Sequence, residues 1–442
     1  MTTRPDPPAP LGAFGGFIAR ARAEKRLVVQ PRMGFPDPRR MREGLDAVKA
    51  ARARTIGTIT VDSYTRTGDH DGAREALAAG ADLNGFPLVA HGPAVTREML
   101  RGVESAEFPV QVRHGAPLPY DILRTLAEAG LTATEGGPVS YCLPYGRTPL
   151  RDSVRAWRGA CEMLASHDGR AGPVHMESFG GCLLGQLCPP GLLVAVTLLE
   201  GLFFRQAGIR SVSLSYAQQT NPRQDTEAVS VLRELAGEYL ADTDWHVVIY
   251  TYMGVYPRTR AGAANLLRQS AGLAVRTGAE RLIVKTEVEA YRIPTIAENV
   301  RALEIAEEAA AEERSLLGAS APPAAPRDTG IGAESRALVE AVLSLDADIG
   351  TALVKAFEQG LLDVPYCLHA DNHGRARSYI DEEGRLGWVD TGRMPITGSV
   401  RTGAPERIGA DHLLNMLSFV ERRFDESELA KRASRRHDGL AP

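Results

Sequence analysis

Cysteine is scarce in this sequence of 442 residues, and the cysteines that are present form no recognisable pairs. None of the five belongs to a Cys-x-x-Cys motif: Cys142, Cys161, Cys182, Cys188 and Cys367. An odd number without such spacing argues against a disulfide framework and against a structural zinc site. We therefore expect a protein of a reducing compartment, the cytoplasm.

The sequence also lacks the long apolar segments of secreted and membrane-embedded proteins. Its first residues, Met-Thr-Thr-Arg-Pro-Asp-Pro-Pro, contain no apolar core for a signal peptide. The longest apolar region, Gly191–Phe204, is interrupted by Glu200 and Gly201 and is shorter than a membrane-spanning helix requires. We expect this region to be a buried helix, and we expect no membrane partner.

Neither sign of charge dominates. Lys and Arg number 51 against 55 Asp and Glu, which gives a net charge of -4. Such a balance does not indicate a nucleic-acid or membrane-surface partner. The hydrophobic fraction of 44% and the charged fraction of 24% are typical of globular proteins.

Short segments rich in Val, Ile, Thr or Tyr alternate with longer helical patterns from about Leu27 to about Ala311. The predicted strands are Leu27–Val29, Thr55–Val61, Leu88–His91, Val110–Arg113, Thr132–Thr134, Val174–Glu177, Ser211–Ser215, Val247–Tyr252 and Leu282–Thr286. The predicted helices include Pro38–Ala53, Asp71–Ala79, Thr96–Glu104, Pro119–Glu128, Leu150–Ala165 and Gln224–Leu240. This alternation predicts a parallel sheet covered by helices. Eight or nine repeats favour a (β/α)8 TIM barrel over a doubly wound sheet, because no Gly-x-Gly-x-x-Gly turn follows the first strand.

The composition changes after the predicted barrel. We expect a TIM-barrel domain over residues 1–315 and an Ala/Pro/Gly-rich linker over 316–333. A smaller α+β extension over 334–425 contains helical patterns and a polar hairpin around residues 381–384. The charged tail, 426–442, is expected to be frayed.

Three arginines stand at or just beyond the ends of predicted strands: Arg32, Arg66 and Arg113. In an α/β barrel the carboxyl ends of the strands meet at one mouth, where binding and catalytic groups lie. Converging guanidinium groups repel one another unless they face an anion, and each can hold a carboxylate through two parallel hydrogen bonds. One such arginine alone would be an ordinary surface or ion-pair residue. The set of three suits a small dicarboxylate or a phosphate.

Glu135, just after the fifth predicted strand, helps to choose between these anions. A carboxylate repels phosphate but attracts an ammonium group, and the sequence has no Gly-x-x-x-x-Gly-Lys-Ser/Thr loop for phosphate. Arginines combined with one acid therefore favour an acidic amino acid. Tyr141 and Tyr145 either donate hydrogen bonds to it or pack as half-buried side chains. Lys285 and Glu289, four residues apart, could instead form a simple ion pair.

Several longer segments resemble the large (epsilon) subunit of glutamate mutase, also called methylaspartate mutase. They are Val-Asp-Ser-Tyr-Thr-Arg (61–66), Leu-Asn-Gly-Phe-Pro (83–87), Gln-Val-Arg-His-Gly (111–115), Glu-Gly-Gly-Pro-Val-Ser-Tyr-Cys-Leu-Pro-Tyr (135–145), Glu-Ser-Phe-Gly (177–180), Ile-Val-Lys-Thr-Glu-Val-Glu-Ala (283–290) and Ala-Phe-Glu-Gln-Gly-Leu-Leu-Asp-Val-Pro (356–365). The likeness extends from Arg32 to about Asp390. Tyr250-Thr251-Tyr252-Met253 and the stretch before Phe179 depart from the family pattern.

The resemblance implies a TIM barrel and assigns roles to the matching positions. The positions that match the family's substrate site are Arg32, Arg66 and Arg113, with Glu135 as the base beside the substrate ammonium group, and Tyr141 and Tyr145. The positions that match the family's adenosyl-binding site are Lys285 and Glu289 at the ribose, and Phe179 near the cofactor. No position of this chain is expected to bind a metal.

The resemblance also implies the reaction and the partners. The family uses adenosylcobalamin to interconvert L-glutamate and L-threo-3-methylaspartate by radical fragmentation and recombination. Cobalamin is bound by a separate small (sigma) subunit with the motif Asp-x-His-x-x-Gly, which this sequence lacks. The implied assembly is a homodimer of this chain within a heterotetramer.

Two features leave other interpretations open. His369, Asp371 and His373 form His-x-Asp-x-His, which could bind a metal or belong to a solvated loop. The rival functions are a cobalamin-independent lyase acting on an acidic amino acid and a non-catalytic ligand-binding barrel. A lyase of this kind would usually need a metal held by clustered carboxylates, which the strand ends do not offer.

Overall fold

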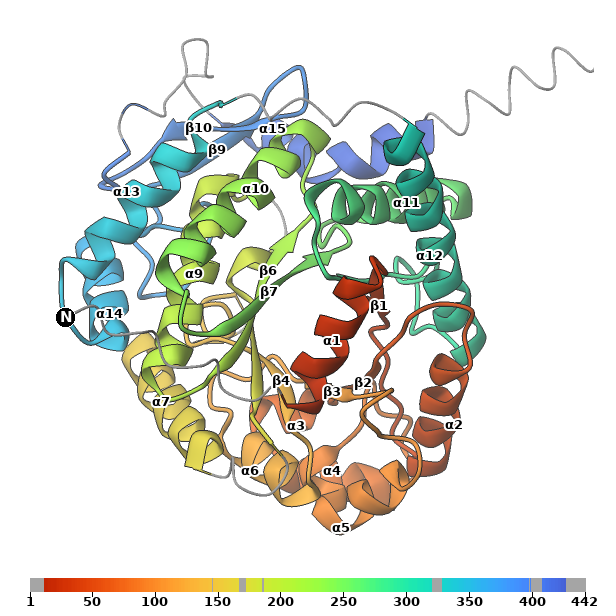
Figure 1. Cartoon of the computed structure of the whole chain (residues 1–442). Coiled ribbons are helices and arrows are strands. Elements are labelled where there is room, and N and C mark those ends of the chain that lie inside the picture. Colours follow the sequence, from red (N-terminus) through yellow and green to blue (C-terminus); the bar gives the residue numbers. More distant parts are fainter. Residues whose placement is uncertain are drawn as a thin grey trace, which may run out of the picture.

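The computed structural model of the chain describes residues 12–144, 146–166, 172–184, 187–319, 328–396, 398 and 408–426. Within these residues, parallel strands form one eight-stranded sheet in the order β1-β8-β7-β6-β5-β4-β3-β2. The strands are β1 (Val28–Gln30), β2 (Gly57–Thr60), β3 (Val110–Arg113), β4 (Ala133–Gly136), β5 (His175–Ser178), β6 (Ser211–Ala217), β7 (Asp244–Tyr250) and β8 (Arg281–Ile283). The sheet curves inside a ring of helices (Figure 1). This arrangement confirms the predicted (β/α)8 TIM barrel.

The first and second strands close the barrel through a few contacts instead of a full ladder. An isolated parallel bridge joins Val29 to Thr55, and the Val29 N–H donates to the Arg54 carbonyl at 2.8 Å. Farther along, the Thr60 N–H donates to the Met33 carbonyl, also at 2.8 Å. These bonds bring the ends of β1 and β2 together at the barrel mouth.

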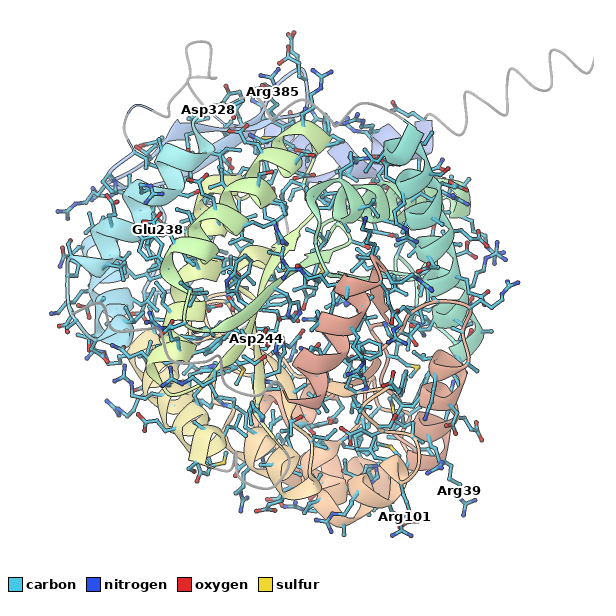
Figure 2. The ribbon with its side chains drawn as sticks, viewed as in Figure 1. Arg39, Arg101, Glu238, Asp244, Asp328 and Arg385 are labelled. Carbon is cyan, nitrogen blue, oxygen red and sulfur yellow. The ribbon has the colours of Figure 1, made fainter. Side chains whose placement is uncertain are left out.

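Helices cover the outside of the sheet. They include α2 (Pro38–Lys49), α4 (His70–Ala78), α5 (Leu88–Leu100), α6 (Tyr120–Ala129), α7 (Leu150–Ser166), α9 (Pro190–Gln206), α10 (Pro222–Tyr239), α11 (Arg260–Thr277) and α12 (Ile296–Ala319). Their outer faces carry charged side chains, and Arg39 and Arg101 project from the edge of the molecule (Figure 2). The strands between them are buried on both faces, as expected for a parallel sheet inside a ring of helices.

The apolar region Gly191–Phe204 lies inside α9 and is buried throughout, which confirms the prediction of a buried helix. Across the described part of the chain, every helix is too short or too polar to span a bilayer.

One predicted strand was wrong. Leu88–His91 forms the first turn of α5, and the chain before it makes only a single parallel bridge, between Val61 and Phe86. A run of four residues is too short for its apolar pattern to distinguish a strand from a helical turn. The other predicted strands coincide with β1 to β8 within a few residues.

A helix that the sequence reading did not include, α1 (Ala13–Ala23), lies across the end of the barrel where the strands begin (Figure 1). Its Phe14 ring stacks on His175, with the ring centroids 4.4 Å apart, and lies 5.0 Å from the guanidinium carbon of Arg281. Both partners belong to strands, so α1 closes this end and leaves the opposite end for a site.

The C-terminal region packs directly on the barrel. It contains α13 (Ile331–Leu343), α14 (Ile349–Gln359), an antiparallel hairpin of β9 (Arg377–Ile380) and β10 (Leu386–Asp390), and α15 (Ala410–Leu417). α13 packs on α9 and α14 on α7, and the buried residues of both join the barrel core. The hairpin was predicted at this position. Within the predicted linker, α12 continues to Ala319 and α13 starts at Ile331, whereas residues 320–327 and the tail 427–442 lie outside the described residues.

Candidate functional site

A cavity of about 290 Å³ opens at the end of the barrel opposite α1. It lies where β1 to β5 and β7 end. Its lining consists of Arg32, Thr60, Val61, Asp62, Ser63, Arg66, Asn84, Arg113, His114, Gly115, Glu135, Tyr141, Phe179 and Met253. The three arginines that the sequence places near strand ends therefore share one cavity with Glu135.

The three arginines reach the cavity from different elements. Arg113 is the last residue of β3, and Arg32 lies two residues beyond β1. Arg66 does not end a strand: it belongs to the short helix α3 (Ser63–Thr67), which follows β2. Gly115, with φ at 71°, turns the chain after β3 beside Arg66, and a Cβ at that position would stand 3.1 Å from the Arg66 Cδ. Only glycine combines this backbone angle with the close approach.

The arginines differ in their partners. Arg113 Nε donates to Glu135 Oε2 at 2.7 Å, and Arg32 Nη1 donates to Glu289 Oε2 at 3.1 Å. Arg66 has no ion pair among the described residues. The lining also holds Asp62, but its carboxylate accepts N–H groups of α3, so Arg66 remains the guanidinium without a carboxylate partner among the described residues. Such a site attracts an anion.

Glu135 is held by three side chains. Besides Arg113, it accepts hydrogen bonds from the hydroxyls of Tyr141, on Oε1, and Tyr250, on Oε2 at 2.7 Å. Burial disfavours the charge of Arg113, but the Glu135 carboxylate outweighs this and raises the pKa of Arg113 well above its usual range. The Arg113–Glu135 pair is thus charged and fixed in orientation. Arg113 uses Nε for it, and its two Nη groups have no hydrogen-bond partner in the described part of the chain.

His114 was not selected from the sequence, although it stands inside Gln-Val-Arg-His-Gly. Its Nδ1 accepts the Ala116 N–H at 3.1 Å, and its ring stacks on Trp157 with centroids 5.6 Å apart. Burial lowers the pKa of His114 to about 3, so the ring is neutral and its proton resides on Nε2. That Nε2 is buried and makes no well-aligned hydrogen bond among the described residues, although the Glu135 backbone lies near enough to counter part of the fall in pKa. Because His114 lines the cavity, it can offer a ligand an uncharged hydrogen-bond donor.

The positions expected to contact a cofactor follow two different strands, β5 and β8, and only Phe179 among them lines the cavity. Phe179 lines it, with its ring 5.0 Å from Tyr141. Lys285 lies just beyond β8 with Nζ 4.2 Å from the centre of the Tyr256 ring, and burial lowers its pKa to about 8. Glu289 bonds Arg32 instead of forming the alternative pair with Lys285, and it accepts the Thr286 N–H at 2.8 Å. Arg32 therefore connects the cavity to the segment that follows β8. Tyr145, which was expected at the substrate site, lies outside the described residues.

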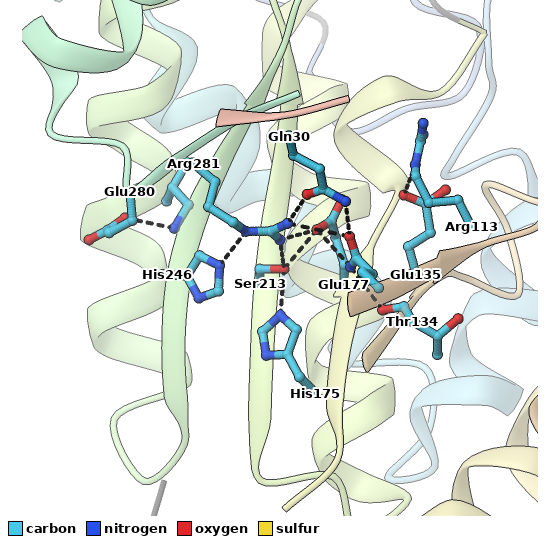
Figure 3. Close-up of polar contacts among 12 residues, drawn as sticks. Gln30, Arg113, Thr134, Glu135, His175, Glu177, Ser213, His246, Glu280 and Arg281 are labelled. Carbon is cyan, nitrogen blue, oxygen red and sulfur yellow. Dashed lines mark hydrogen bonds and ion pairs between the residues drawn. The ribbon is translucent and has the colours of Figure 1, made fainter. Parts of the chain in front are cut away.

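A cluster of buried polar side chains fills the barrel beneath the cavity (Figure 3). Arg281 of β8 is fully buried and pairs with Glu177 of β5, which also accepts from Gln111 Nε2 at 3.2 Å and from Ser213 Oγ at 3.1 Å. Arg281 also donates to Gln30 Oε1 at 2.6 Å. These residues were not predicted from the sequence. Each is a polar side chain inside a predicted or observed strand, where apolar residues would be usual, and this pattern could have indicated a buried polar cluster.

Glu200 is another missed residue that shapes the site. It belongs to the apolar helix α9, yet its Oε1 accepts the N–H groups of Val139 and Ser140, and its Oε2 accepts the hydroxyls of Ser140 and Ser178. Burial raises the pKa of Glu200 to about 7. Three of these hydrogen bonds fix the chain that leads from β4 to Tyr141, and the fourth connects Glu200 to β5. Glu200 is a charged residue within the longest apolar run of the sequence, and this position could have indicated its structural role.

The His-x-Asp-x-His segment has structural contacts of its own. His369 Nε2 lies 3.0 Å from the Thr148 carbonyl, Asp371 accepts the Leu150 N–H at the start of α7 at 2.6 Å, and His373 Nε2 lies 3.0 Å from the Glu358 carbonyl. Through these contacts the three residues hold the start of α7 and the end of α14 in place. In the described part of the chain no three His, Cys, Asp or Glu side chains are grouped to hold a metal ion.

Comparison with known proteins gives a consistent result. A family model described as Methylaspartate mutase E chain (MutE) matches residues 10–411. The glutamate mutase epsilon subunit of Escherichia coli O157:H7 is 30% identical over 396 residues, which cover 87% of this chain and 81% of the relative. That of Yersinia enterocolitica is 32% identical over 358 residues, with coverages of 78% and 73%. That of Desulfitobacterium hafniense is 30% identical over 422 residues, with coverages of 89% and 83%.

Proposed function

Because the chain belongs to the methylaspartate mutase E chain family, we propose that it is the substrate-binding subunit of an adenosylcobalamin-dependent isomerase. The proposed reaction interconverts L-glutamate and L-threo-3-methylaspartate. The observation that carries the proposal is the meeting of Arg32, Arg66 and Arg113 with Glu135 in one small cavity. A dicarboxylate that bears one ammonium group complements this arrangement of charges.

The proposed binding mode follows from the groups left without partners. The two Nη groups of Arg113 and the unpaired guanidinium of Arg66 are available for the carboxylates of the substrate. His114 Nε2 would donate an additional, uncharged hydrogen bond. Glu135, held by Tyr141 and Tyr250, would accept hydrogen bonds from the substrate ammonium group. Fixing both ends of the substrate would keep the fragments of a cleaved carbon skeleton together, which is an effective-concentration effect.

The chain also has suitable groups for the adenosyl part of the cofactor. Lys285 and Glu289 would contact the ribose hydroxyls, and Phe179 would pack nearby at the cavity wall. Two polar atoms in the same region, the Tyr256 hydroxyl and Thr286 Oγ1, are buried without a partner among the described residues, so hydrogen-bonding capacity remains. Adenosylcobalamin, when bound, would supply the radical that removes hydrogen from the substrate.

We further propose that a small cobalamin-binding subunit covers this end of the barrel. Large apolar side chains are exposed on the segments that follow β2, β3 and β8: Tyr64, Leu118, Tyr120, Tyr291 and Ile293. Exposed aromatic and aliphatic groups around a polar cavity are typical of a protein interface. A protein bound there would exclude water from the cavity. The proposed assembly is a heterotetramer with two copies of each subunit.

Reconstitution tests the proposal. The full chain would be mixed with a cognate small subunit that carries Asp-x-His-x-x-Gly and with adenosylcobalamin, and formation of 3-methylaspartate from L-glutamate would be followed by chromatography. Product that requires all three components is the expected result. Ammonia release without cobalamin would instead indicate a lyase, and glutamate binding without turnover in any combination would indicate a ligand-binding barrel.

A further inference from the structure

Tyr250, the last residue of β7, connects the cavity with the polar cluster beneath it. Its hydroxyl lies 2.7 Å from Glu135 Oε2 and also bonds Glu177. Its ring lies beneath the Arg113 guanidinium, with 5.3 Å between Cζ and the ring centre. Tyr250 is fully buried and does not line the cavity, so it supports both members of the Arg113–Glu135 pair from below.

The lower contact of Tyr250 is itself anchored. Glu177 accepts hydrogen bonds from Arg281, Ser213 and Gln111, which come from three different strands of the barrel (Figure 3). A carboxylate bonded on so many sides has little freedom to move. The Tyr250 hydroxyl is therefore held against a rigid support, and this support extends upward to Glu135.

The chemistry of the hydroxyl explains why a tyrosine suits this position. A phenol carries a single proton, so the Tyr250 hydroxyl can donate to only one carboxylate at a time, and both the Glu135 and the Glu177 oxygens lie within its reach. Burial, together with the charges of Glu135 and Glu177, raises the pKa of Tyr250 well above its usual range. The hydroxyl stays protonated, and it fixes the direction in which the free lone pairs of Glu135 point.

We propose that Tyr250 is a positioning residue, which holds the Glu135 carboxylate in the orientation that receives the substrate ammonium group. The inference rests on the proposed function, because it takes Glu135 as the ammonium contact. Tyr250 would act through Glu135 without touching the substrate. Its removal should then weaken recognition of the ammonium group while leaving recognition of the two carboxylates intact.

Two ligands separate these contributions. L-Glutamate carries two carboxylates and an ammonium group, whereas glutarate carries the same carboxylates on the same carbon chain without the ammonium group. Titration calorimetry of the full chain would give the affinity for each ligand, and KM and kcat would be measured in the reconstituted complex. In Tyr250→Phe we expect glutamate to bind roughly tenfold more weakly and glutarate to bind as in the wild type, because a hydrogen bond to a charged group is lost.

A matched control is Tyr216→Phe. Tyr216 is also a fully buried strand tyrosine, on the neighbouring β6, and its hydroxyl bonds Asp225 at 2.9 Å, away from the cavity. This variant should lose a similar hydrogen bond without changing the ratio of the two affinities. Glu177→Gln provides a second test, since it weakens the support without altering Tyr250, and it should also lower the preference for glutamate.

The outcomes are distinct. A lowered preference for glutamate over glutarate in Tyr250→Phe, with the ratio unchanged in Tyr216→Phe, supports the inference. An unchanged ratio in Tyr250→Phe overturns it while glutamate binding by the wild type still supports the proposed function. A wild-type chain and complex that bind glutarate but show no preference for glutamate would overturn both the role of Glu135 and the inference.

Discussion

Arg113 illustrates how one side chain can serve the protein with one nitrogen and leave the others for the proposed ligand. Its Nε is committed to Glu135 at 2.7 Å, and this bond fixes the plane of the guanidinium. The two Nη groups then face the cavity in a defined direction. An arginine used in this way is preorganised, so less side-chain entropy is lost when a carboxylate binds.

Replacing Arg113 by Met should reduce kcat/KM for L-glutamate by roughly 100-fold, because a charged, forked pair of hydrogen bonds is lost and Glu135 loses its cation. Steady-state kinetics of the reconstituted complex would measure this. Arg101→Met is the control, since Arg101 is exposed at the end of α5 and, among the described residues, pairs only with Glu98. Wild-type kinetics in Arg113→Met would contradict the proposed substrate site.

Glu200 predicts a pH dependence of stability. Burial raises its pKa to about 7 in the folded protein, above the value of 4.5 for a free side chain. The folded state therefore holds a proton that the unfolded state has released between these pH values. The free energy of unfolding should fall as pH rises from about 4.5 to about 7, by on the order of 3 kcal/mol from this group, and then level off.

The Glu200→Gln variant isolates this contribution. It retains an acceptor oxygen for the Val139 and Ser140 N–H groups but cannot ionise. Urea unfolding of both proteins across this pH range should show the difference in stability shifting in favour of the variant as pH rises. A difference that is independent of pH would refute the raised pKa.

Only some of the individual residues at the site could be predicted from the sequence. Arg32, Arg113 and Glu135 could be selected because each stands at or just after a predicted strand. Tyr250 and Arg281 could not, since a polar residue within a strand faces either the barrel axis or a helix, and the pattern does not show which side chains converge. Contacts between residues more than 100 positions apart, such as Arg281 with Glu177, depend on the closed barrel.

Among the elements, the short helix α3 determines the position of Arg66 in the cavity, because it carries this residue. Five residues are too few to form a stable helix alone. Asp62 supports it by accepting the N–H groups of Tyr64 and Thr65 at 2.9 and 3.1 Å and the Thr65 hydroxyl. The position of Arg66 therefore depends on a cap that belongs to the preceding chain.

The variant Asp62→Ala should lose about 1 kcal/mol of stability, as other N-cap replacements do. Its affinity for glutamate should fall several-fold, because Arg66 is no longer held over the cavity. Asp62→Asn keeps an acceptor for the N–H groups and should retain most of the affinity. Calorimetric titration and thermal unfolding would measure both, and equal affinity in all three proteins would show that α3 does not need its cap.

The order of the elements was largely predictable, whereas their junctions were not. Strands such as Val110–Arg113 combine β-branched residues with clear boundaries, and the prediction there matches β3 at both ends. Leu88–His91 combines apolar residues with a following Gly-Pro, which suits the end of a strand as well as a kinked helical start. Gly92, with φ at 76°, interrupts α5 at this point, so the helical pattern was hidden.

For the whole molecule, the barrel is closed at one end and open at the other. Phe14 of α1 packs against His175 and Arg281 at the closed end, and the cavity lies at the opposite end. The structure thus separates the sealed end from the end with the cavity, where we propose that the substrate binds, as is usual for this fold.

Truncating Phe14 tests this separation. Phe14→Ala should lower the free energy of unfolding by roughly 3 kcal/mol, because a large buried ring is removed and a cavity remains. The affinity for glutamate should change little. Phe14→Leu should lose less stability, and chemical unfolding together with ligand titration would compare the variants. A tenfold loss of glutamate affinity in Phe14→Ala would contradict the separation.

The helix across the strand origins has one more consequence. The barrel is closed at the strand origins by α1, and its interior is filled with ion-paired side chains. A ligand would therefore enter and leave the cavity through the same opening. If the proposed small subunit covers this opening, ligand exchange would require that subunit to move away or dissociate.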